Sequence, residues 1–340
     1  MSLDQGQGTP EQRMAGLLGG FRSTQMLHVA AKLGIADELA DGPKSVGRLA
    51  QITHSNEGAL FRLLRALASM GVFAERSDGS FELTPLASTL RKDTEDSQRM
   101  YALSYGESWW WNAFGQLLHS VQTGEPGFDH VYGMNLFEYL NGHPDAARVF
   151  NGNMTAMTVV GADAVAAAYD FSAAGALIDI GGGHGALASA ILHKNPHLRA
   201  VLFDQPLVID NAPQVLQRLG IQARCELVPG DFFVSVPSGG DIYTLKDILH
   251  DWDDTRSMLI LGNIRRVMGA RARLLIIERV IPSGNGPFVG KHVDITMLVL
   301  TGGMERTELE YRRLIEAAGL KLSRVVPTAT GSSIIETVPV

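Results

Sequence analysis

The chain lacks the features that mark secreted and membrane-spanning proteins. Its single cysteine, Cys225, excludes an internal disulfide and fits a reducing compartment. No apolar run reaches the ~20 residues that a membrane-spanning helix needs. The opening segment MSLDQGQGTPEQRM has no apolar stretch of the kind that signal peptides contain. We therefore expect a cytoplasmic protein without a leader sequence.

An excess of positive charge is absent as well. Lysine and arginine number 29 against 36 acidic residues, which gives a formal net charge of −7. This balance predicts no nucleic-acid partner and no attraction to an anionic membrane. Internal repeats and low-complexity tracts are absent too. At 340 residues, with 45% hydrophobic residues, the chain predicts one large and one small domain, each with its own core.

The first half of the chain carries helical periodicity. Residues 58–71 place leucines on one face and predict an amphipathic helix that ends at Gly71. A shorter helix is expected over residues 45–53, and the alternating pattern after Gly71 turns at Asp78-Gly79. Two helices followed by a hairpin are typical of a winged helix. Basic and acidic residues nearly cancel here, which favours packing or dimerisation over DNA binding.

The opening helices predict an interface. The stretch 26–39 is too apolar for a solvated surface, so we expect a homodimer built by a domain over residues 1–105. Burial of this stretch against the second domain, which would span residues 106–340, is the alternative.

A run of three tryptophans, residues 109–111, cannot face one way on a helix. Trp110 is therefore a candidate wall for a flat aromatic ligand, together with Met154 and Met157 at helical spacing. Ordinary core packing explains each of these side chains equally well. We assign residues 106–170 to a helical segment that lines the substrate pocket.

The second half predicts an α/β fold with a doubly wound, Rossmann-like sheet. Candidate strands at residues 177–180, 200–203, 226–228, 241–245 and 274–278 alternate with helical spacers, which indicates a parallel sheet covered on both faces. A helix at 308–318 precedes two further β segments, 320–326 and 333–337. Their short connection permits only antiparallel pairing, so the sheet should end in an antiparallel hairpin.

Glycines follow the first of these strands in a G-x-G-x-G pattern, at Gly181, Gly183 and Gly185. Such a turn lets a ligand approach the backbone at a helix N-terminus. Asp204 ends the next strand, where an acid binds a ribose diol; a plain turn or helix cap is the alternative. The spacing departs from the G-x-G-x-x-G of dinucleotide enzymes and favours S-adenosyl-methionine over NAD.

Further cofactor contacts are predicted along the same edge of the sheet. Asp231, after the third strand, can accept the adenine amino group, and Phe232 can flank the ring. Lys246 ends the fourth strand and is either a contact near the cofactor or a solvated lysine.

His250 follows the fourth strand and is the natural general base at neutral pH. A helix-capping or core histidine is the alternative, but the position on the ligand edge favours catalysis. Glu278 and Glu305 fall on the same edge, and carboxylates beside an imidazole fix its tautomer. Either glutamate could instead form a structural ion pair with Arg279 or Arg306.

A metal site is an alternative for His250, Asp251, Asp253 and Asp254, which offer nitrogen and oxygen ligands. Adjacent positions at a helix start point in different directions, and no H-x-x-x-H or cysteine pair supports them. We therefore predict no bound metal.

The motifs LIDIGGGHG, LFDQP, VPGDFF, LKDILHDWDD, IIERVIP, HVDITML and GGMERT together resemble a known family. The chain is similar to the S-adenosyl-methionine-dependent O-methyltransferases of the caffeic-acid and acetylserotonin type, including their bacterial small-molecule branch. The resemblance covers nearly the whole chain. It implies methylation of a hydroxyl on a small aromatic secondary metabolite, a methyltransferase sheet after a winged-helix dimerisation domain, and His250 as base between Glu278 and Glu305.

The acceptor is not encoded in any spacing. His292, Asp294 and Met297 either touch it or support the helix that they begin. Two other functions stay open: non-methylating chemistry, found in relatives that lost the histidine, and a winged-helix regulator that senses a metabolite.

Overall fold

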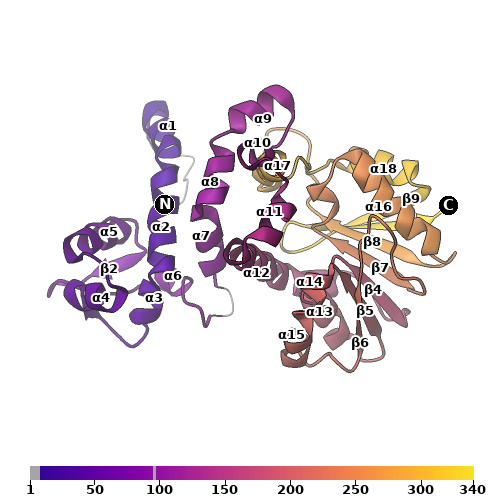
Figure 1. The fold of residues 1–340 in the computed structure, drawn as a ribbon, viewed down its shortest axis with the longest axis horizontal. Helices are drawn as coiled ribbons and strands as arrows, with labels where there is room; N and C mark the ends of the chain where they lie inside the picture. Colours follow the sequence, from indigo (N-terminus) through magenta and orange to yellow (C-terminus); the bar gives the residue numbers. More distant parts are fainter. Residues whose placement is uncertain (1–7, 95–96) are drawn as a thin grey trace. The chain divides into compact units, whose positions relative to one another are not determined.

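The computed structural model describes residues 8–94 and 97–340, and the chain forms two compact units (Figure 1). The first comprises Met1–Asn112 and His143–Ala156, and the second comprises Ala113–Gly142 and Met157–Val340. The first seven residues of the segment inspected for a signal peptide lie outside the described part. Within the described part, none of the helices combines the length and apolarity required to cross a bilayer.

The first unit contains the predicted helix–helix–hairpin order. Its elements are α1 (Pro10–Leu18), α2 (Gly20–Lys32), α3 (Ile35–Glu38), β1 (Lys44–Ser45), α4 (Val46–Thr53), α5 (Glu57–Ser69), β2 (Phe73–Glu75), β3 (Ser80–Leu83), α6 (Pro85–Ser88), α7 (Arg99–Gly106) and the first parts of α8 (Ser108–Phe114) and α12 (Pro144–Ala168). Ser45 and Asn56 cap α4 and α5 by accepting backbone N–H groups. Gly79, at φ +75°, makes the turn between β2 and β3.

The apolar stretch 26–39 is not one helix. Gly34, at φ +68°, separates α2 from α3 because this backbone conformation cannot continue a right-handed helix. His28 of α2 is buried, and its Nδ1 lies 3.0 Å from the carbonyl oxygen of Leu103 in α7. A Cβ on Gly106 would stand 2.1 Å from the His28 ring, so only glycine admits this contact. Part of the stretch is thus covered within its own unit.

The second unit is built on a seven-stranded sheet. Its strands are β4 (Ala176–Ile180), β5 (Arg199–Asp204), β6 (Cys225–Pro229), β7 (Ile242–Lys246), β8 (Arg273–Glu278), β9 (Leu320–Pro327) and β10 (Ser333–Pro339), in the order β6-β5-β4-β7-β8-β10-β9. The first five in the chain are parallel, and β10 inserts antiparallel between β8 and β9. The predicted parallel sheet and terminal antiparallel hairpin are confirmed.

Helices cover both faces of this sheet (Figure 1). They are α13 (Ala186–Lys194), α14 (Pro206–Ile209), α15 (Ala212–Arg218), α16 (Asp254–Val267) and α18 (Glu308–Ala317), joined by α9 (Leu117–Thr123), α10 (Gly127–Tyr132), α11 (Leu136–Gly142), α17 (Gly290–Leu300) and the end of α12 (Pro144–Ala168). Alternate strand residues face opposite layers. Leu177 packs with α13 and α15, whereas Ile178 packs with α16 and α18.

Candidate active site

The turn after β4 packs against Ile248 at its first glycine, Gly181, and has open space at its third glycine, Gly183. Gly181 and Gly183 have φ values of +65° and +58°, which favour glycine over residues with a side chain. A Cβ on Gly181 would stand 2.4 Å from the Ile248 side chain. A Cβ on Gly183 would meet nothing within 4 Å, so space opens before its backbone at the start of α13.

Asp204 lies directly beside this turn. Its Oδ2 accepts the N–H of Gly183 at 2.8 Å, and its Oδ1 accepts the N–H of Gln205 at 2.7 Å. Burial raises the pKa of the Asp204 carboxyl. The open glycine turn and the adjoining carboxylate suit an adenosyl cofactor, because a carboxylate can accept hydrogen bonds from ribose hydroxyls.

Asp231 and Phe232 follow β6 at the same edge. The N–H of Gly230 bonds the carbonyl oxygen of Asp204, which brings the two loops together at 2.9 Å. Asp231 is exposed and accepts the N–H of Phe233 at 2.8 Å, while the ring of Phe232 is half-buried. The predicted cofactor residues at the ends of β4, β5 and β6 are therefore neighbours.

Lys246 and Asp247, whose side chains are 8% and 15% exposed, form an ion pair at the end of β7. Asp247 adopts φ +52°, a left-handed conformation that is uncommon outside glycine. Its second carboxylate oxygen lies 3.4 Å from Nη1 of Arg279. Burial alone would raise the pKa of Asp247, but Lys246, His250 and Arg279 lower it to about 2. Because its ammonium pairs with Asp247, Lys246 offers a ligand chiefly its backbone.

His250 lies on a short 3-10 turn, Leu249–Asp251, and the side chain of Glu278 binds the backbone where this turn begins. Glu278 Oε1 accepts the N–H groups of Ile248 and Leu249 at 3.1 and 2.9 Å. The Nδ1 atom of His250 lies 3.0 Å from Oε1 of Glu305 and 3.5 Å from Oε2 of Glu278. The structure thus brings together the three residues predicted to be catalytic.

The imidazole is buried between negative charges, which decides its protonation. Burial alone would lower the pKa of His250, but attraction to Glu278 and the hydrogen bond to Glu305 outweigh it and raise the pKa to about 10. Burial also raises the pKa of Glu278 and that of Asp251, the latter to about 6. The surrounding carboxylates thus favour the protonated form of His250.

The loop that carries Glu305 packs directly on the histidine turn. A Cβ on Gly303 would stand 1.9 Å from the carbonyl oxygen of His250, so backbone meets backbone there. Asp294 of α17 accepts the N–H of Glu305 at 2.9 Å. Asp294, a predicted substrate contact, therefore holds the loop of Glu305.

Two arginines occupy different places from those their sequence neighbours suggest. Arg279 Nη1 lies 3.6 Å from Oε1 of Glu305, one of the ion pairs considered for the glutamates, whereas Arg306 bonds Asp254 and not its neighbour Glu305. Successive side chains along extended backbone point to opposite sides, so an arginine next to a glutamate faces away from it. Charge alternation in the sequence could not reveal these partners.

Two of the acids considered as metal ligands bind protein groups instead: Asp253 caps a helix, and Asp254 pairs with Arg306. Asp253 caps α16 by accepting the N–H of Arg256 at 2.8 Å. A different set, Asp247, His250 and Glu278, offers ligand atoms within 4.8 Å of one another. Both oxygens of Asp247 already face cations, so this set fits a charge network better than a metal site. The predicted absence of a metal stays a prediction.

Known proteins share both units of this chain. Two family models match: an O-methyltransferase dimerisation domain over residues 15–93 and an O-methyltransferase domain over residues 114–321. The chain belongs to the O-methyltransferase family. The resemblance found in the sequence, the enzyme class and the methyltransferase fold are thereby confirmed.

Three matches, one to a curated protein and two to solved structures, illustrate the family. Phenazine O-methyltransferase PhzM of Lysobacter antibioticus is 49% identical over 324 residues, which cover 95% of each chain. The crystal structure of LaPhzM superposes with a TM-score of 0.95 at 48% identity, covering 98% of this chain and 100% of that one. An O-methyltransferase of neocarzinostatin biosynthesis, solved with S-adenosyl-methionine and 2-hydroxy-5-methyl naphthoic acid, gives 0.82 at 30% identity, with 94% and 96% covered. The predicted cofactor, S-adenosyl-methionine, is confirmed.

The substrate residues predicted for this O-methyltransferase are divided between the units. Trp110 and Met154 belong to the first unit, whereas Met157, His292 and Met297 belong to the second. Trp110 is half-buried and lies 4.9 Å from the ring of Tyr105, and His292 is exposed. Trp109 is the fully buried member of the tryptophan run.

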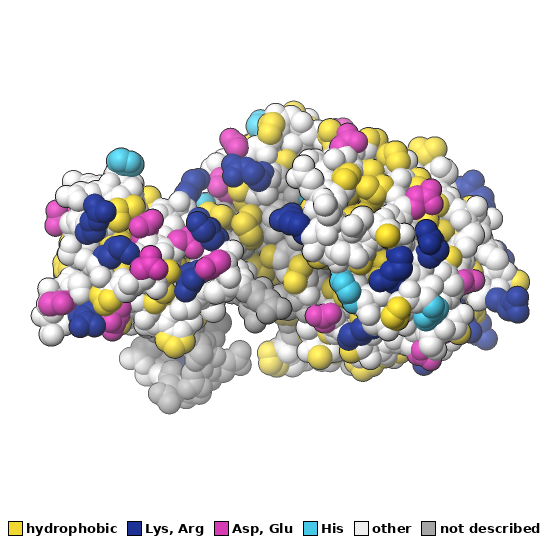
Figure 2. All heavy atoms as spheres, turned by 90° about the horizontal axis from the view of Figure 1, so that it is seen from below, with side chains coloured by type: hydrophobic (Ala, Val, Ile, Leu, Met, Phe, Trp, Pro, Cys, Tyr) yellow, Lys and Arg dark blue, Asp and Glu magenta, His cyan; other side chains and the backbone are white. Residues whose placement is uncertain are grey.

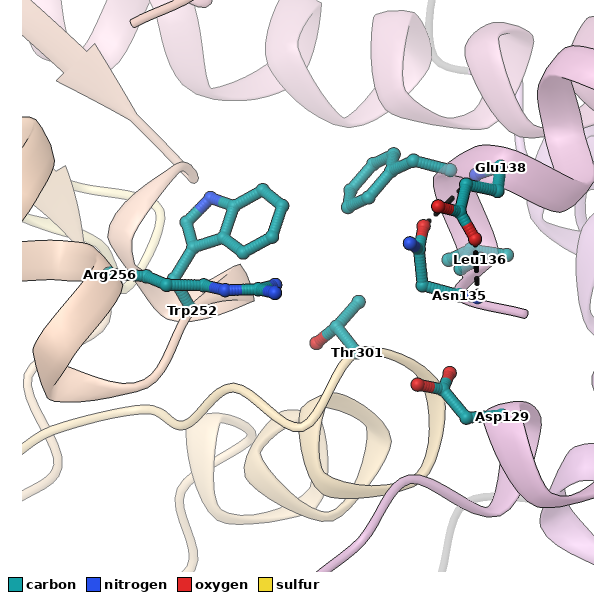
Figure 3. A pocket seen from close by; sticks show the side chains of 8 residues that line it. Asp129, Asn135, Leu136, Glu138, Trp252, Arg256 and Thr301 are labelled. Atoms are coloured by element: carbon teal, nitrogen blue, oxygen red, sulfur yellow. Dashed lines mark hydrogen bonds between the residues drawn. The ribbon is translucent and has the colours of Figure 1, made fainter. Parts of the chain in front are cut away.

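A cavity of about 260 Å³ lies within the second unit of the O-methyltransferase (Figure 3). Trp252 and Arg256 line one side, and Asn135, Leu136 and Glu138 line the other, with Asp129 and Thr301 between them. The guanidinium of Arg256 stands 5.3 Å from the Trp252 ring centroid, and burial raises the pKa of Asp129. None of the individually predicted substrate residues lines this cavity, although Asp129, Asn135, Leu136 and Glu138 belong to the segment 106–170 that the sequence assigns to a pocket.

Proposed function

We propose that this enzyme moves a methyl group from S-adenosyl-methionine to a hydroxyl of a small aromatic metabolite, with His250 as the general base. The observation that supports this proposal best is the pair of contacts from His250 Nδ1 to Glu305 and Glu278, at 3.0 and 3.5 Å. They hold one ring nitrogen, while Nε2 lies 3.9 Å from Oδ1 of Asp251, beyond hydrogen-bond distance, and can take a substrate proton.

His250 takes the acceptor proton as the phenolic oxygen bonds the methyl carbon, the methyl–sulfur bond breaks, and S-adenosyl-homocysteine leaves. A phenol of pKa near ~10 is a poor nucleophile at neutral pH, so the base matters. Glu305 holds the ring by Nδ1, and Glu278 offsets the positive charge that arrives on it. S-adenosyl-methionine, when bound, supplies an electrophilic methyl on a positively charged sulfur. Alignment and exclusion of water then provide much of the remaining rate.

His250 must lose its proton before it can act as a base. Four carboxylates surround the imidazole or its neighbours: Asp247, Asp251, Glu278 and Glu305. Their negative charge favours imidazolium in the free protein. A positive sulfonium nearby would disfavour imidazolium, so His250 becomes a competent base only when the cofactor is in place.

The glycine turn and its neighbours bind the cofactor in this proposal. Gly181 and Gly183 lie along it, Asp204 binds the ribose, and Asp231 with Phe232 binds the adenine. Lys246 contributes through its backbone. The open space before Gly183 and the partly buried Asp204 carboxylate support this arrangement.

The aromatic acceptor is assigned to the segment 106–170 and to α17. Trp110, Met154, Met157, His292 and Met297 are the proposed contacts. Asp294 acts on the acceptor only indirectly, through the Glu305 loop. We also propose that the dimerisation domain ends at residue 105 and that the methyltransferase domain begins at residue 106.

The first unit is proposed to form a homodimer through a winged-helix-like domain. Apolar side chains near its beginning are largely exposed: Met14, Leu17, Leu18 and Phe21 are between 56 and 70% accessible. Water-exposed leucines at this density suit a partner surface. Acidic and basic side chains intermix on the face drawn in Figure 2, and Arg76 pairs with Glu82 at 2.9 Å. This mixture disfavours DNA as the partner.

An acceptor screen tests the proposed reaction. Phenolic acids, flavonoids, naphthoates, quinones and phenazines would each be incubated with the enzyme and methyl-labelled cofactor, with matched amines as a second arm. Products that gain one labelled methyl on oxygen support the proposal. Methylation confined to nitrogen, or turnover of an acceptor without methyl gain, contradicts it.

A further inference from the structure

Arg306 is completely buried, and its guanidinium holds the main chain on both sides of His250. Nη1 donates to the carbonyl oxygen of Leu249 at 3.1 Å, and Nη2 donates to that of Trp252 at 2.9 Å. The remaining contacts are Nε and Nη2 to Asp254 Oδ1 at 3.0 and 2.8 Å, Nη1 to the Met304 carbonyl at 3.4 Å, and Nη2 to Ser257 Oγ at 3.4 Å.

The main chain of Arg306 is also fixed. It forms a parallel bridge with Val280, and its carbonyl oxygen accepts the N–H of Ile281 at 3.0 Å, just beyond the end of β8. Glu305 precedes Arg306, and their side chains leave this extended segment in opposite directions. One side chain therefore reaches the imidazole of His250, while the next reaches the backbone that carries this imidazole.

We propose that Arg306 is a positioning residue that sets the distance between the His250 imidazole and Glu305. The inference rests on the proposed role of His250 as base. A planar guanidinium with several fixed donors can hold two carbonyl groups and a carboxylate at once. Lysine offers a compact point charge on a flexible stem and cannot reproduce that geometry.

Stability alone explains this arrangement poorly. Burying a guanidinium carries a large desolvation cost, and the carboxylate of Asp254, which it bonds, is 66% exposed. A side chain of similar volume without charge would avoid that cost. What the arginine adds is a defined geometry around the residue on which proton transfer depends.

Three variants test the inference, each measured in the full-length enzyme. R306K removes the planar set of guanidinium donors but keeps the positive charge. D254N keeps Arg306 and removes only the negative charge of the exposed carboxylate that it bonds. R224K is the matched control, because Arg224 Nη1 likewise donates to several carbonyl oxygens, at Leu192, Asn195, Pro196 and Leu198, around β5 and α13. Readouts are the ¹⁵N signals of the His250 ring, its titration, and kcat and KM on an acceptor from the screen.

We expect R306K to lower kcat by about 10- to 100-fold, as small misplacements of a catalytic group do, with little change in KM. The His250 signals should move toward those of E305Q. In the E305Q background, R306K should add little further loss, because both changes act on one contact. D254N should show the same changes more weakly, and R224K should leave the His250 signals in place.

The inference is overturned if R306K keeps the His250 signals and the kcat of the wild type. It is also overturned if the loss of kcat in the R306K/E305Q double variant equals the product of the two single losses. If R306K fails to fold, D254N decides: unchanged ring signals and kcat there also overturn it. The ring signals distinguish this failure from failure of the proposed function. Should H250A retain full turnover, the base assignment is wrong, while the spectra still report whether Arg306 positions the ring.

Discussion

Nδ1 of His250 and Oε1 of Glu305 lie 3.0 Å apart although 55 positions separate them in the chain. The contact joins the turn after β7 to the loop after α17. One ring nitrogen is thereby held by a carboxylate, and the other, 3.9 Å from Oδ1 of Asp251, is the one proposed to take the acceptor proton. The reactivity of the site depends on this relationship.

The charge around His250 predicts an unusual pH dependence. Its pKa in the free enzyme is raised to about 10, so its neutral form becomes abundant only as pH rises toward that value. The kcat/KM for the cofactor, which reports on free enzyme, should rise through the alkaline range with a midpoint above the ordinary ~6.5. A midpoint at or below 6.5 would contradict the raised pKa.

Removal of either glutamate charge should move this midpoint downward. E278Q and E305Q each take away a negative charge that favours imidazolium, so the pKa of His250 should fall in both. Turnover should fall as well, but less than on loss of the imidazole itself. Matching pH–rate profiles in wild type and both variants would count against the two assignments.

Cofactor charge should control the proton on His250. S-adenosyl-methionine carries a positive sulfur, and S-adenosyl-homocysteine does not. Titration of the His250 ring by NMR should therefore give a lower pKa with the former than with the latter. Equal values in the two complexes would mean that the ring and the sulfur do not sense each other.

Gly303 should tolerate no side chain. G303A places a methyl group against the His250 carbonyl, which must displace the loop from the turn. We expect a loss of about 1–3 kcal/mol in stability, and a fall in kcat. Thermal unfolding and kinetics would measure both. G262A, in α16 with open space around its Cβ, is the control and should be neutral or slightly stabilising.

The sequence predicted the sheet well because its signals were local. Each buried strand formed a short β-rich run, and the short link between β9 and β10 left antiparallel pairing as the only option. The residues at the strand ends, from Gly181 to Glu278, could be placed because parallel strands end at one edge. The apolar stretch 26–39 was harder, since a single glycine at position 34 divided it.

The residues that surround the base were not predictable in the same way. Asp247, Arg279 and Arg306 act through contacts between segments that are far apart in the chain. Their partners depend on side-chain direction within loops, for which no periodicity exists. The position of the cavity beside Trp252 could not be predicted for the same reason, because its lining residues come from segments that are far apart in the chain.

Substitution of His250 tests the central claim most directly. H250A should lower turnover of an accepted phenol by about 10²–10⁴-fold, while S-adenosyl-methionine still binds with a Kd equal to or below that of the wild type. Such a result would assign proton removal, rather than cofactor binding, to the imidazole. Undiminished turnover in a folded H250A enzyme would remove His250 from the reaction and with it the mechanism proposed for this site.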